Sequence, residues 1–192
     1  CKGNPQLLED IVRLMLQRGI LLDKGEVWDL QLDRLKGAPL PATVNGAAKA
    51  RVDALPERER RVLDMAAVFG PVFWFNGVAA MLRLNEPDKE PTEGLPLHWV
   101  EDKPEARLNA ILLEMQGNDL VEFRSESGLP GQVAFGFVNP IEQQRLYSSL
   151  KAESKRRWHR VAAEWLRSIA PEESFQLREV ISWHYEQGGL KQ

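Results

Sequence analysis

One feature of the sequence constrains the fold of this chain more than any other. Apolar residues first recur at the spacing of helices and then at the spacing of strands. Three segments place apolar residues three or four positions apart, as helices with one buried face do, and two later segments place large apolar residues at every second position, as strands do. The helical positions are Val62, Leu63, Ala66 and Ala67, then Phe75, Val78, Ala79 and Leu82, then Leu108, Ile111, Leu112 and Met115; the alternating positions are Val121 and Phe123, then Val133, Phe135 and Phe137. The sequence therefore predicts a mainly α fold with a small β-hairpin.

Residues 43–139 are predicted to form one domain around these segments. Thr43 can cap a helix that runs to about Leu55, and Pro56 opens the next helix. A turn at residues 128–131 joins the two alternating segments. Three helices followed by a hairpin is the order of elements in a winged helix, in which the hairpin is the wing. We therefore predict a winged-helix domain over this range.

The segment Asn85–Lys103 separates the second and third of these helices and is longer than the usual connection between helices. It is acidic and rich in proline, yet it carries Leu95, Leu97, Trp99 and Val100. These apolar residues indicate that part of the segment packs on the domain. A contact with a partner specific to this protein is the alternative.

Residues 1–35 are predicted to form a helix and a hairpin that belong to a different domain. Asn4 is a good N-cap and Pro5 a good first helical residue. The apolar stripe of the helix is Leu8, Ile11, Val12 and Met15, and the hairpin pairs Ile20–Leu22 with Val27–Leu30. Because only Cys1 and Lys2 precede the Gly3–Pro5 stretch that opens the helix, we expect the helix to lack the layer on which it packs, and the chain to be a piece of a longer protein.

Two further segments complete the division of the chain. Residues 36–42, which contain one glycine and two prolines, are predicted to be a linker. Residues 140–192 are predicted to be helical, and the cap-and-proline signal recurs at Asn139 and Pro140. The apolar stripes of these helices are Ile141, Tyr147 and Leu150, then Trp158, Val161, Ala162, Trp165, Leu166 and Ile169, then Leu177, Val180, Ile181 and His184.

Charge and composition bear on several functional classes. A net charge of −3 over 192 residues argues against strong nonspecific binding to nucleic acid. No apolar run reaches the length that crosses a bilayer, and no phosphate-binding loop of the form G-x-x-x-x-G-K-[ST] occurs. We therefore expect no membrane insertion and no ATP hydrolysis by this chain. The single cysteine excludes an internal disulfide and favours a reducing compartment, so a cytoplasmic protein is expected.

The sequence predicts no catalytic residue and no metal site. His98 lies in the long segment, His159 and His184 lie on separate predicted helices, and Cys1 lies at the start of the chain. Their spacing is not that of zinc ligands. Because His184 belongs to an apolar stripe, it is interpreted as a hydrogen-bonded core histidine.

Several short segments, none of them specific alone, form an ordered series along the chain. The series is Gly3–Pro5, Leu40–Val44, Arg51–Leu55, Val62–Gly70, Phe135–Asn139, Leu146–Tyr147, Trp158–Ala162 and Trp183–Tyr185. In order and spacing it resembles the region that follows the nucleotide-binding core of STAND-type ATPases, which are signal-transduction ATPases related to the AAA+ proteins. The relatives implied include bacterial kinases, nucleotide cyclases and LuxR-like regulators.

The resemblance implies candidate nucleotide-binding residues. Gly3, Asn4 and Pro5 match the GxP element that ends the lid of the nucleotide domain, and its proline lies against the adenine of a nucleotide bound upstream. Asn139 stands where relatives commonly have a histidine that contacts phosphate, and an asparagine cannot carry a positive charge. A simple N-cap role is the alternative for Asn139. ATP or ADP with magnesium is implied for the parent protein, and no cofactor for this segment.

The function implied is that of a non-catalytic regulatory and interaction segment. It would couple the nucleotide state of the upstream domain to a downstream array of tetratricopeptide-like helical repeats, whose first helices are residues 140–192, and to an unidentified protein partner. The alternatives are a winged-helix DNA-binding transcriptional regulator and a scaffold that has lost nucleotide sensing. Basic residues that would suit DNA are Lys151, Lys155, Arg156, Arg157 and Arg160. They are interpreted as a solvated helix face, and the third helix of the predicted winged helix carries Glu105, Arg107 and Glu114, so DNA is not the expected partner.

Overall fold

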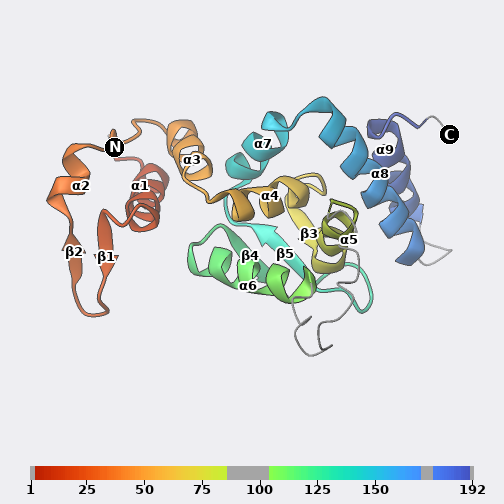
Figure 1. The fold of residues 1–192 in the computed structure, drawn as a ribbon, viewed down its shortest axis with the longest axis horizontal. Helices are drawn as coiled ribbons and strands as arrows, with labels where there is room; N and C mark the ends of the chain where they lie inside the picture. The colour runs from red at the N-terminus through yellow and green to blue at the C-terminus, as the bar shows by residue number, and fades with distance from the viewer. Residues whose placement is uncertain (1–2, 86–103, 170–174, 191–192) are drawn as a thin grey trace, which may run out of the picture.

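The computed structural model describes residues 3–85, 104–169 and 175–190, and these are mainly helical, as predicted. Three groups of elements follow one another along the longest axis of the molecule (Figure 1). The N-terminal helix and hairpin lie at one end, and the last two helices lie at the other. Of the long segment Asn85–Lys103, only the first residue lies within the described residues, so its predicted packing falls outside them.

The N-terminal group is a helix, a hairpin and a short second helix: α1 (Pro5–Gln17), β1 (Leu21–Asp23), β2 (Trp28–Leu30) and α2 (Leu32–Lys36). Asn4 caps α1, since its Oδ1 accepts a hydrogen bond from the backbone N–H of Leu7 at 3.1 Å. The hairpin is antiparallel with Leu21 opposite Leu30, which confirms the predicted pairing. The short helix α2 was not predicted, because five residues are too few to display a period.

Helix α1 packs on α3 (Val44–Asp53), and Leu7, Ile11 and Ala47 form the small core between them. The predicted stripe is wrong in part, because Leu8 is 55% exposed whereas Leu7 and Leu14 are buried. The expectation that α1 lacks a layer is also wrong. Its covering layer comes from a helix that follows it in the sequence, which periodicity within one helix cannot show.

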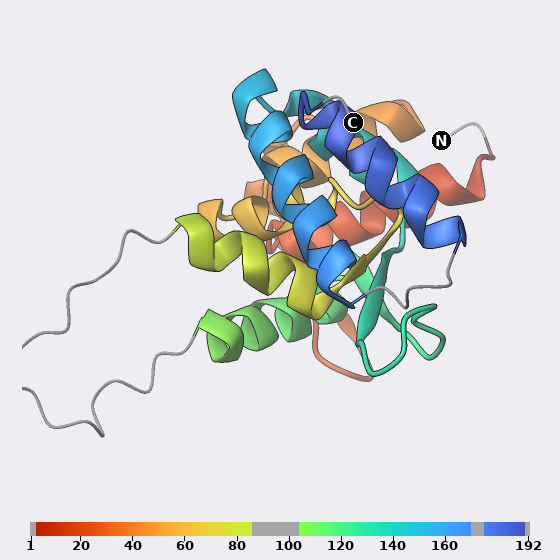
Figure 2. The same ribbon diagram turned by 90° about the vertical axis from the view of Figure 1, so that its right-hand side faces the viewer.

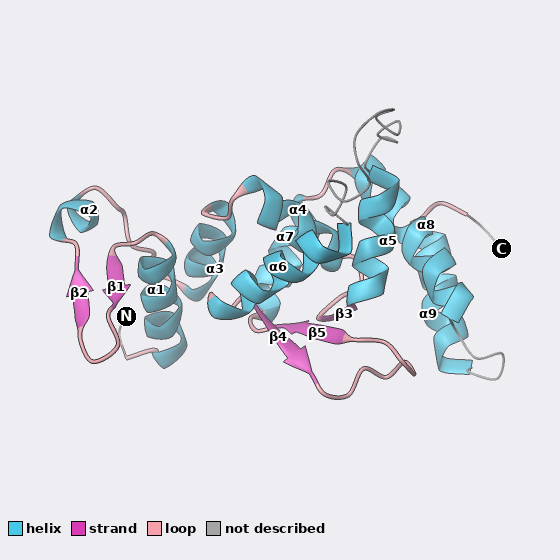
Figure 3. Cartoon of the chain, turned by 60° about the horizontal axis from the view of Figure 1, so that its bottom comes forward, coloured by secondary structure: helices cyan, strands magenta, loops and turns pink. Residues whose placement is uncertain are grey.

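The central group contains α4 (Glu57–Ala66), β3 (Val72–Trp74), α5 (Phe75–Asn85), α6 (Pro104–Gly117), β4 (Val121–Arg124) and β5 (Ala134–Phe137). Its strands form one antiparallel sheet in the order β3-β5-β4 (Figure 3). Phe135 lies opposite both Phe73 and Phe123 in this sheet. Strands β4 and β5 are the predicted hairpin. Strand β3 was not predicted, because its three residues run directly into α5 and cannot display alternation.

The main core lies between this sheet and the helices α4, α5 and α6. Its fully buried large side chains include Leu63, Met65, Phe73, Met81, Leu108, Leu112 and Met115. The rings of Phe73 and Phe135 stack with centroids 5.8 Å apart. Helix α7 (Pro140–Ser149) adds Leu146 to the same core, and so closes it on the side of α3.

The C-terminal group is an antiparallel helix pair, α8 (Ala152–Ile169) and α9 (Phe175–Gln187), seen side by side in Figure 2. Helix α8 also packs on α5, and its Trp165 ring meets the ring of Phe69, in the turn after α4, edge to face with centroids 5.7 Å apart. A Cβ added at Gly77 of α5 would lie 2.6 Å from the Phe69 ring, so this close approach requires glycine. The predicted continuation of the pair as an α-solenoid stays a prediction.

Candidate functional site

A buried ionic cluster lies where α1, α3 and α7 meet. Arg51 of α3 and Glu142 of α7 are each 1% exposed, and Nε of Arg51 lies 3.0 Å from Oε1 of Glu142. The Nη2 group of Arg51 also donates to the backbone carbonyls of Asn118 and Asp119, at 3.0 and 3.2 Å. Asp10 of α1 is a second buried carboxylate beside this arginine. We call Asp10, Arg51, Asn139 and Glu142 the ionic cluster; sequence analysis missed it as a group.

Burial dominates the electrostatics of the ionic cluster. It raises the pKa of Glu142 to about 7, against the attraction of Arg51, which lowers that pKa. Burial also raises the pKa of Asp10, with Arg51 again the main opposing influence. The pKa of Arg51 is lowered by burial and restored in part by Glu142. Because these side chains are almost fully enclosed, the ionic cluster ties three helices together and offers no surface to a ligand in this conformation.

The predicted nucleotide-contacting residues lie in two separate places. The turn Gly3–Pro5 is exposed at the start of α1. Asn139 is 3% exposed, and its Oδ1 accepts a hydrogen bond from the backbone N–H two residues on, at 3.0 Å, so it caps α7. It also lies beside Asp10. Asp10 is six residues beyond Asn4, or about 9 Å along the helix axis, so Asn139 meets α1 well past the turn.

We expect Asn139→Ala to lower the free energy of unfolding by about 1–2 kcal/mol, because the cap of α7 and a buried polar contact are lost together. The matched control is Asn4→Ala, which removes an exposed cap and should cost about 0.5–1 kcal/mol. Urea unfolding followed by tryptophan fluorescence measures both. A loss at Asn139 smaller than that at Asn4 would contradict the role assigned to the buried cap.

The histidines of the C-terminal helices form a buried pair. Nδ1 of His159 lies 2.8 Å from Nδ1 of His184, and the Tyr147 hydroxyl lies 2.9 Å from Nε2 of His159. Burial lowers the pKa of His159 to about 4, with a smaller contribution from Lys155, and lowers that of His184 to about 3. Both rings are therefore neutral at pH 7. The interpretation of His184 as a hydrogen-bonded core histidine is confirmed.

The burial of His159 was missed, although the sequence carried a signal for it. Its position continues a helical stripe toward the C-terminus through Ala162, Ala163 and Leu166, all of which are buried. Trp158, which the predicted stripe used instead, is only partly buried. A stripe drawn through the small alanines would have placed His159 inside.

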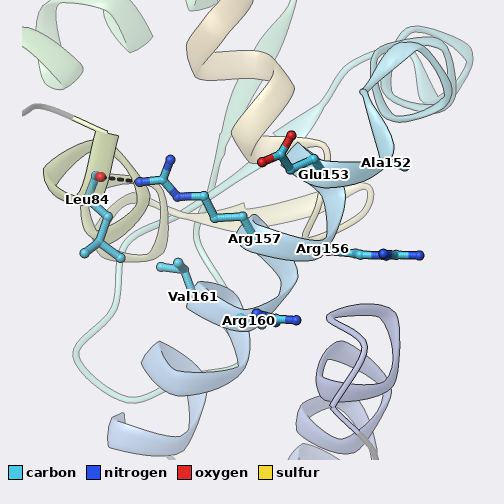
Figure 4. A pocket seen from close by; sticks show the side chains of 7 residues that line it. All are labelled: Leu84, Ala152, Glu153, Arg156, Arg157, Arg160 and Val161. Atoms are coloured by element: carbon cyan, nitrogen blue, oxygen red, sulfur yellow. Dashed lines mark hydrogen bonds between the residues drawn. The ribbon is translucent and has the colours of Figure 1, made fainter.

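The accessible candidate site is a hollow of about 730 Å³ between the end of α5 and the start of α8 (Figure 4). Its lining residues are Leu84, Ala152, Glu153, Arg156, Arg157, Arg160 and Val161. The three arginines are exposed, as predicted for a solvated face, but they surround a concave surface. The candidate third helix for DNA reading, α6, contributes none of these residues.

Comparison with known proteins yields no relative: no family model, no curated protein and no solved structure matches this chain. Among the residues that the structure describes, no helix has the length and apolar character needed to cross a membrane. Within those same residues, no group of three or more His, Cys, Asp or Glu side chains is placed to hold a metal ion. A functional proposal therefore depends on the geometry and the sequence of this chain.

Proposed function

We propose that this chain is a non-catalytic regulatory and interaction segment of a bacterial STAND-type signalling ATPase, and that it acts in the cytoplasm. The observation that carries the proposal is the element order α4-β3-α5-α6-β4-β5 with the strand order β3-β5-β4. Three helices closed by a small antiparallel sheet, with a hairpin at its end, support a winged-helix assignment for this part. The resemblance of the sequence implies such a domain directly after a nucleotide-binding core.

The exposed start of α1 supports a nucleotide role for Gly3, Asn4 and Pro5 in the intact parent protein. The first turn of a helix presents backbone N–H groups without helical partners, which favours a negatively charged neighbour. An upstream domain would hold ATP or ADP with magnesium, and Pro5 would lie against the adenine. The role of this chain would be to respond to the nucleotide rather than to hydrolyse it.

The ionic cluster supports a route for that response. Asp10 lies on the helix that begins with the Gly3–Pro5 turn, and Arg51 and Glu142 lie on α3 and α7. A hinge at Leu35–Pro41 would have to part α1 from α3, because these helices pack across the linker. Parting them would bring buried charges to the surface. Exchange of ADP for ATP would therefore shift the balance between a closed and an opened contact at this cluster.

Titration calorimetry with ADP on the protein extended upstream through its nucleotide domain tests the proposal. We expect Pro5→Ala to weaken ADP binding about tenfold, equivalent to about 1.4 kcal/mol. The matched control is Pro140→Ala, which changes the proline at the same position of α7 and should leave the affinity unchanged. Absence of ADP binding to the extended wild-type protein contradicts the proposal. A gain in affinity on Asn139→His would favour the scaffold that has lost nucleotide sensing.

A further inference from the structure

Helices α5 and α8 border a groove that neither the proposed nucleotide role nor any predicted site residue uses. Two adjoining hollows, of about 730 and 500 Å³, share Leu84, Arg160 and Val161. Along α8 their lining runs from Ala152 to Ser168, which corresponds to about 24 Å of helix and more than four turns. On α5 the lining spans only about one turn, from Ala80 to Leu84, so the groove follows α8 and is suited to a third helix that packs along α8 and against the end of α5.

The floor of the groove is apolar. Leu84 and Val161 line both hollows, and Ala80 and Trp165 line the second one. Leu84 is 57% exposed, so apolar surface at the centre of the groove is left in water. Covering such surface is favourable, because apolar area is removed from water. A helix with apolar residues three or four positions apart supplies a matching stripe.

The flanks of the groove carry positive charge. Arg157 donates to the backbone carbonyl of Leu84 at 2.5 Å, and Nε of Arg160 donates to the carbonyl of Gly188 at 2.6 Å. Figure 4 shows Arg157 reaching toward α5, whereas Arg156 and Arg160 extend toward α9. A carbonyl orients a guanidinium without cancelling its charge. In the part of the chain that the structure describes, no carboxylate forms an ion pair with any of these three arginines.

Two carboxylates line the groove, and they do not outnumber these three arginines. Glu153 lines the first hollow and Glu164 the second, and Glu164 accepts a hydrogen bond from the Tyr185 hydroxyl at 2.7 Å. The whole chain carries a net charge of −3, so a cluster of arginines here runs against its average. The groove thus combines an apolar floor with cationic flanks.

We propose that this groove binds an acidic amphipathic helix of a partner protein. The apolar stripe of that helix would cover Leu84 and Val161, and its Asp and Glu residues would pair with Arg156, Arg157 and Arg160. Nucleic acid fits less well, because a phosphate backbone offers nothing to the apolar floor formed by Leu84, Val161 and Trp165. The inference does not depend on the ATPase proposal, since the groove shares no residue with the Gly3–Pro5 turn or with the ionic cluster.

Fluorescence anisotropy with the 192-residue chain tests the inference. The probe is a fluorescein-labelled 18-residue helical peptide with leucine every third or fourth position and glutamate on both sides of that stripe. We expect a dissociation constant on the order of 10–100 μM at low salt, weakening as salt is added. The comparison probes are the same peptide with lysine in place of glutamate and a fluorescein-labelled DNA duplex.

Three variants locate the binding. Arg157→Glu and Leu84→Asp should each weaken binding of the glutamate peptide about tenfold or more, because each removes one of the two kinds of contact. The matched control Arg58→Glu, an exposed arginine on α4, should change binding less than about twofold. The inference is overturned if the glutamate peptide does not bind at 1 mM, a limit of about −4 kcal/mol. It is equally overturned if the lysine peptide or the duplex binds as tightly, or if Leu84→Asp has no effect.

Discussion

Replacing Arg51 with methionine should lower the free energy of unfolding by about 3–5 kcal/mol, because Glu142 would lose its buried ion-pair partner and Asp10 would keep only Arg13 as a nearby cation. Arg51, Glu142 and Asp10 are each about 1% exposed, so water cannot take the place of the guanidinium. The carbonyls of Asn118 and Asp119 would lose a donor as well. Urea unfolding measures the change, and pH 8 is the condition to use because the pKa of Glu142 is about 7.

Two further variants separate this effect from a general loss of packing. Lys49→Met changes an exposed cation on the same helix, paired with the exposed Asp53, and should cost less than about 1 kcal/mol. Arg51→Met combined with Glu142→Leu removes both charges of the ion pair and leaves Asp10 with Arg13, so it should recover part of the stability, because buried ion pairs are often replaceable by apolar residues. If Arg51→Met unfolds within 1 kcal/mol of the wild type, the ionic cluster is not the tie between α1, α3 and α7 described above.

Acidification should lower the free energy of unfolding through the buried pair His159 and His184. In the folded chain the pKa values are about 4 for His159 and about 3 for His184, below the value of about 6.5 expected for an unfolded histidine. At a pH between the folded and unfolded pKa values, these histidines bind protons in the unfolded state and not in the folded state. The stabilising effect of the neutral pair is therefore present above pH 6.5 and is lost as the pH falls. Lowering the pH from 7 to 5 should remove about 2 kcal/mol per histidine, or about 4 kcal/mol for the pair.

A comparison of variants isolates this contribution. The raised pKa values of Glu142 and Asp10 act in the opposite direction, since their folded forms bind protons more readily than their unfolded forms. These opposing contributions are common to the wild type and to His159→Leu/His184→Leu, so they cancel in the difference between the two. Between pH 7 and pH 5 the free energy of unfolding of the wild type should fall by about 4 kcal/mol more than that of the double variant. Urea unfolding at pH 7, 6 and 5 measures both. Single replacement of His184 should give about half the effect, and parallel pH profiles would refute the assignment.

Local signals were enough to locate most of the helices. Asn4, Thr43 and Asn139 cap the helices that the sequence predicts, because a cap joins groups only two or three residues apart. The two predicted hairpins also form, since alternation and turn residues are local. Two elements were not predicted because they are too short to repeat an apolar spacing: β3 has three residues and α2 has five.

The faces of the helices were harder to predict than their positions. The sequence placed Leu8 inside and treated the face of α1 as uncovered, whereas Leu7 and Leu14 are buried and α3 provides the cover. Several residues fit two neighbouring stripes, and only the partner helix decides between them. For the same reason the burial of His159 was not predicted, since His159 lies one position from Trp158, which was placed on the buried face and is only partly buried.

The sequence by itself determined the order and approximate position of the longer helices and of the two hairpins, because capping, turn formation and periodicity depend on neighbouring residues. Tertiary structure alone decided which charged side chains are buried. Arg51 and Glu142 are ordinary helical residues in the sequence, and they meet because α3 and α7 pack together. Likewise Leu84 and Arg157 border one groove because α8 lies on α5. Desolvation and ion pairing depend on the side chains that surround a charge in space, and for this chain those come from segments far apart in the sequence.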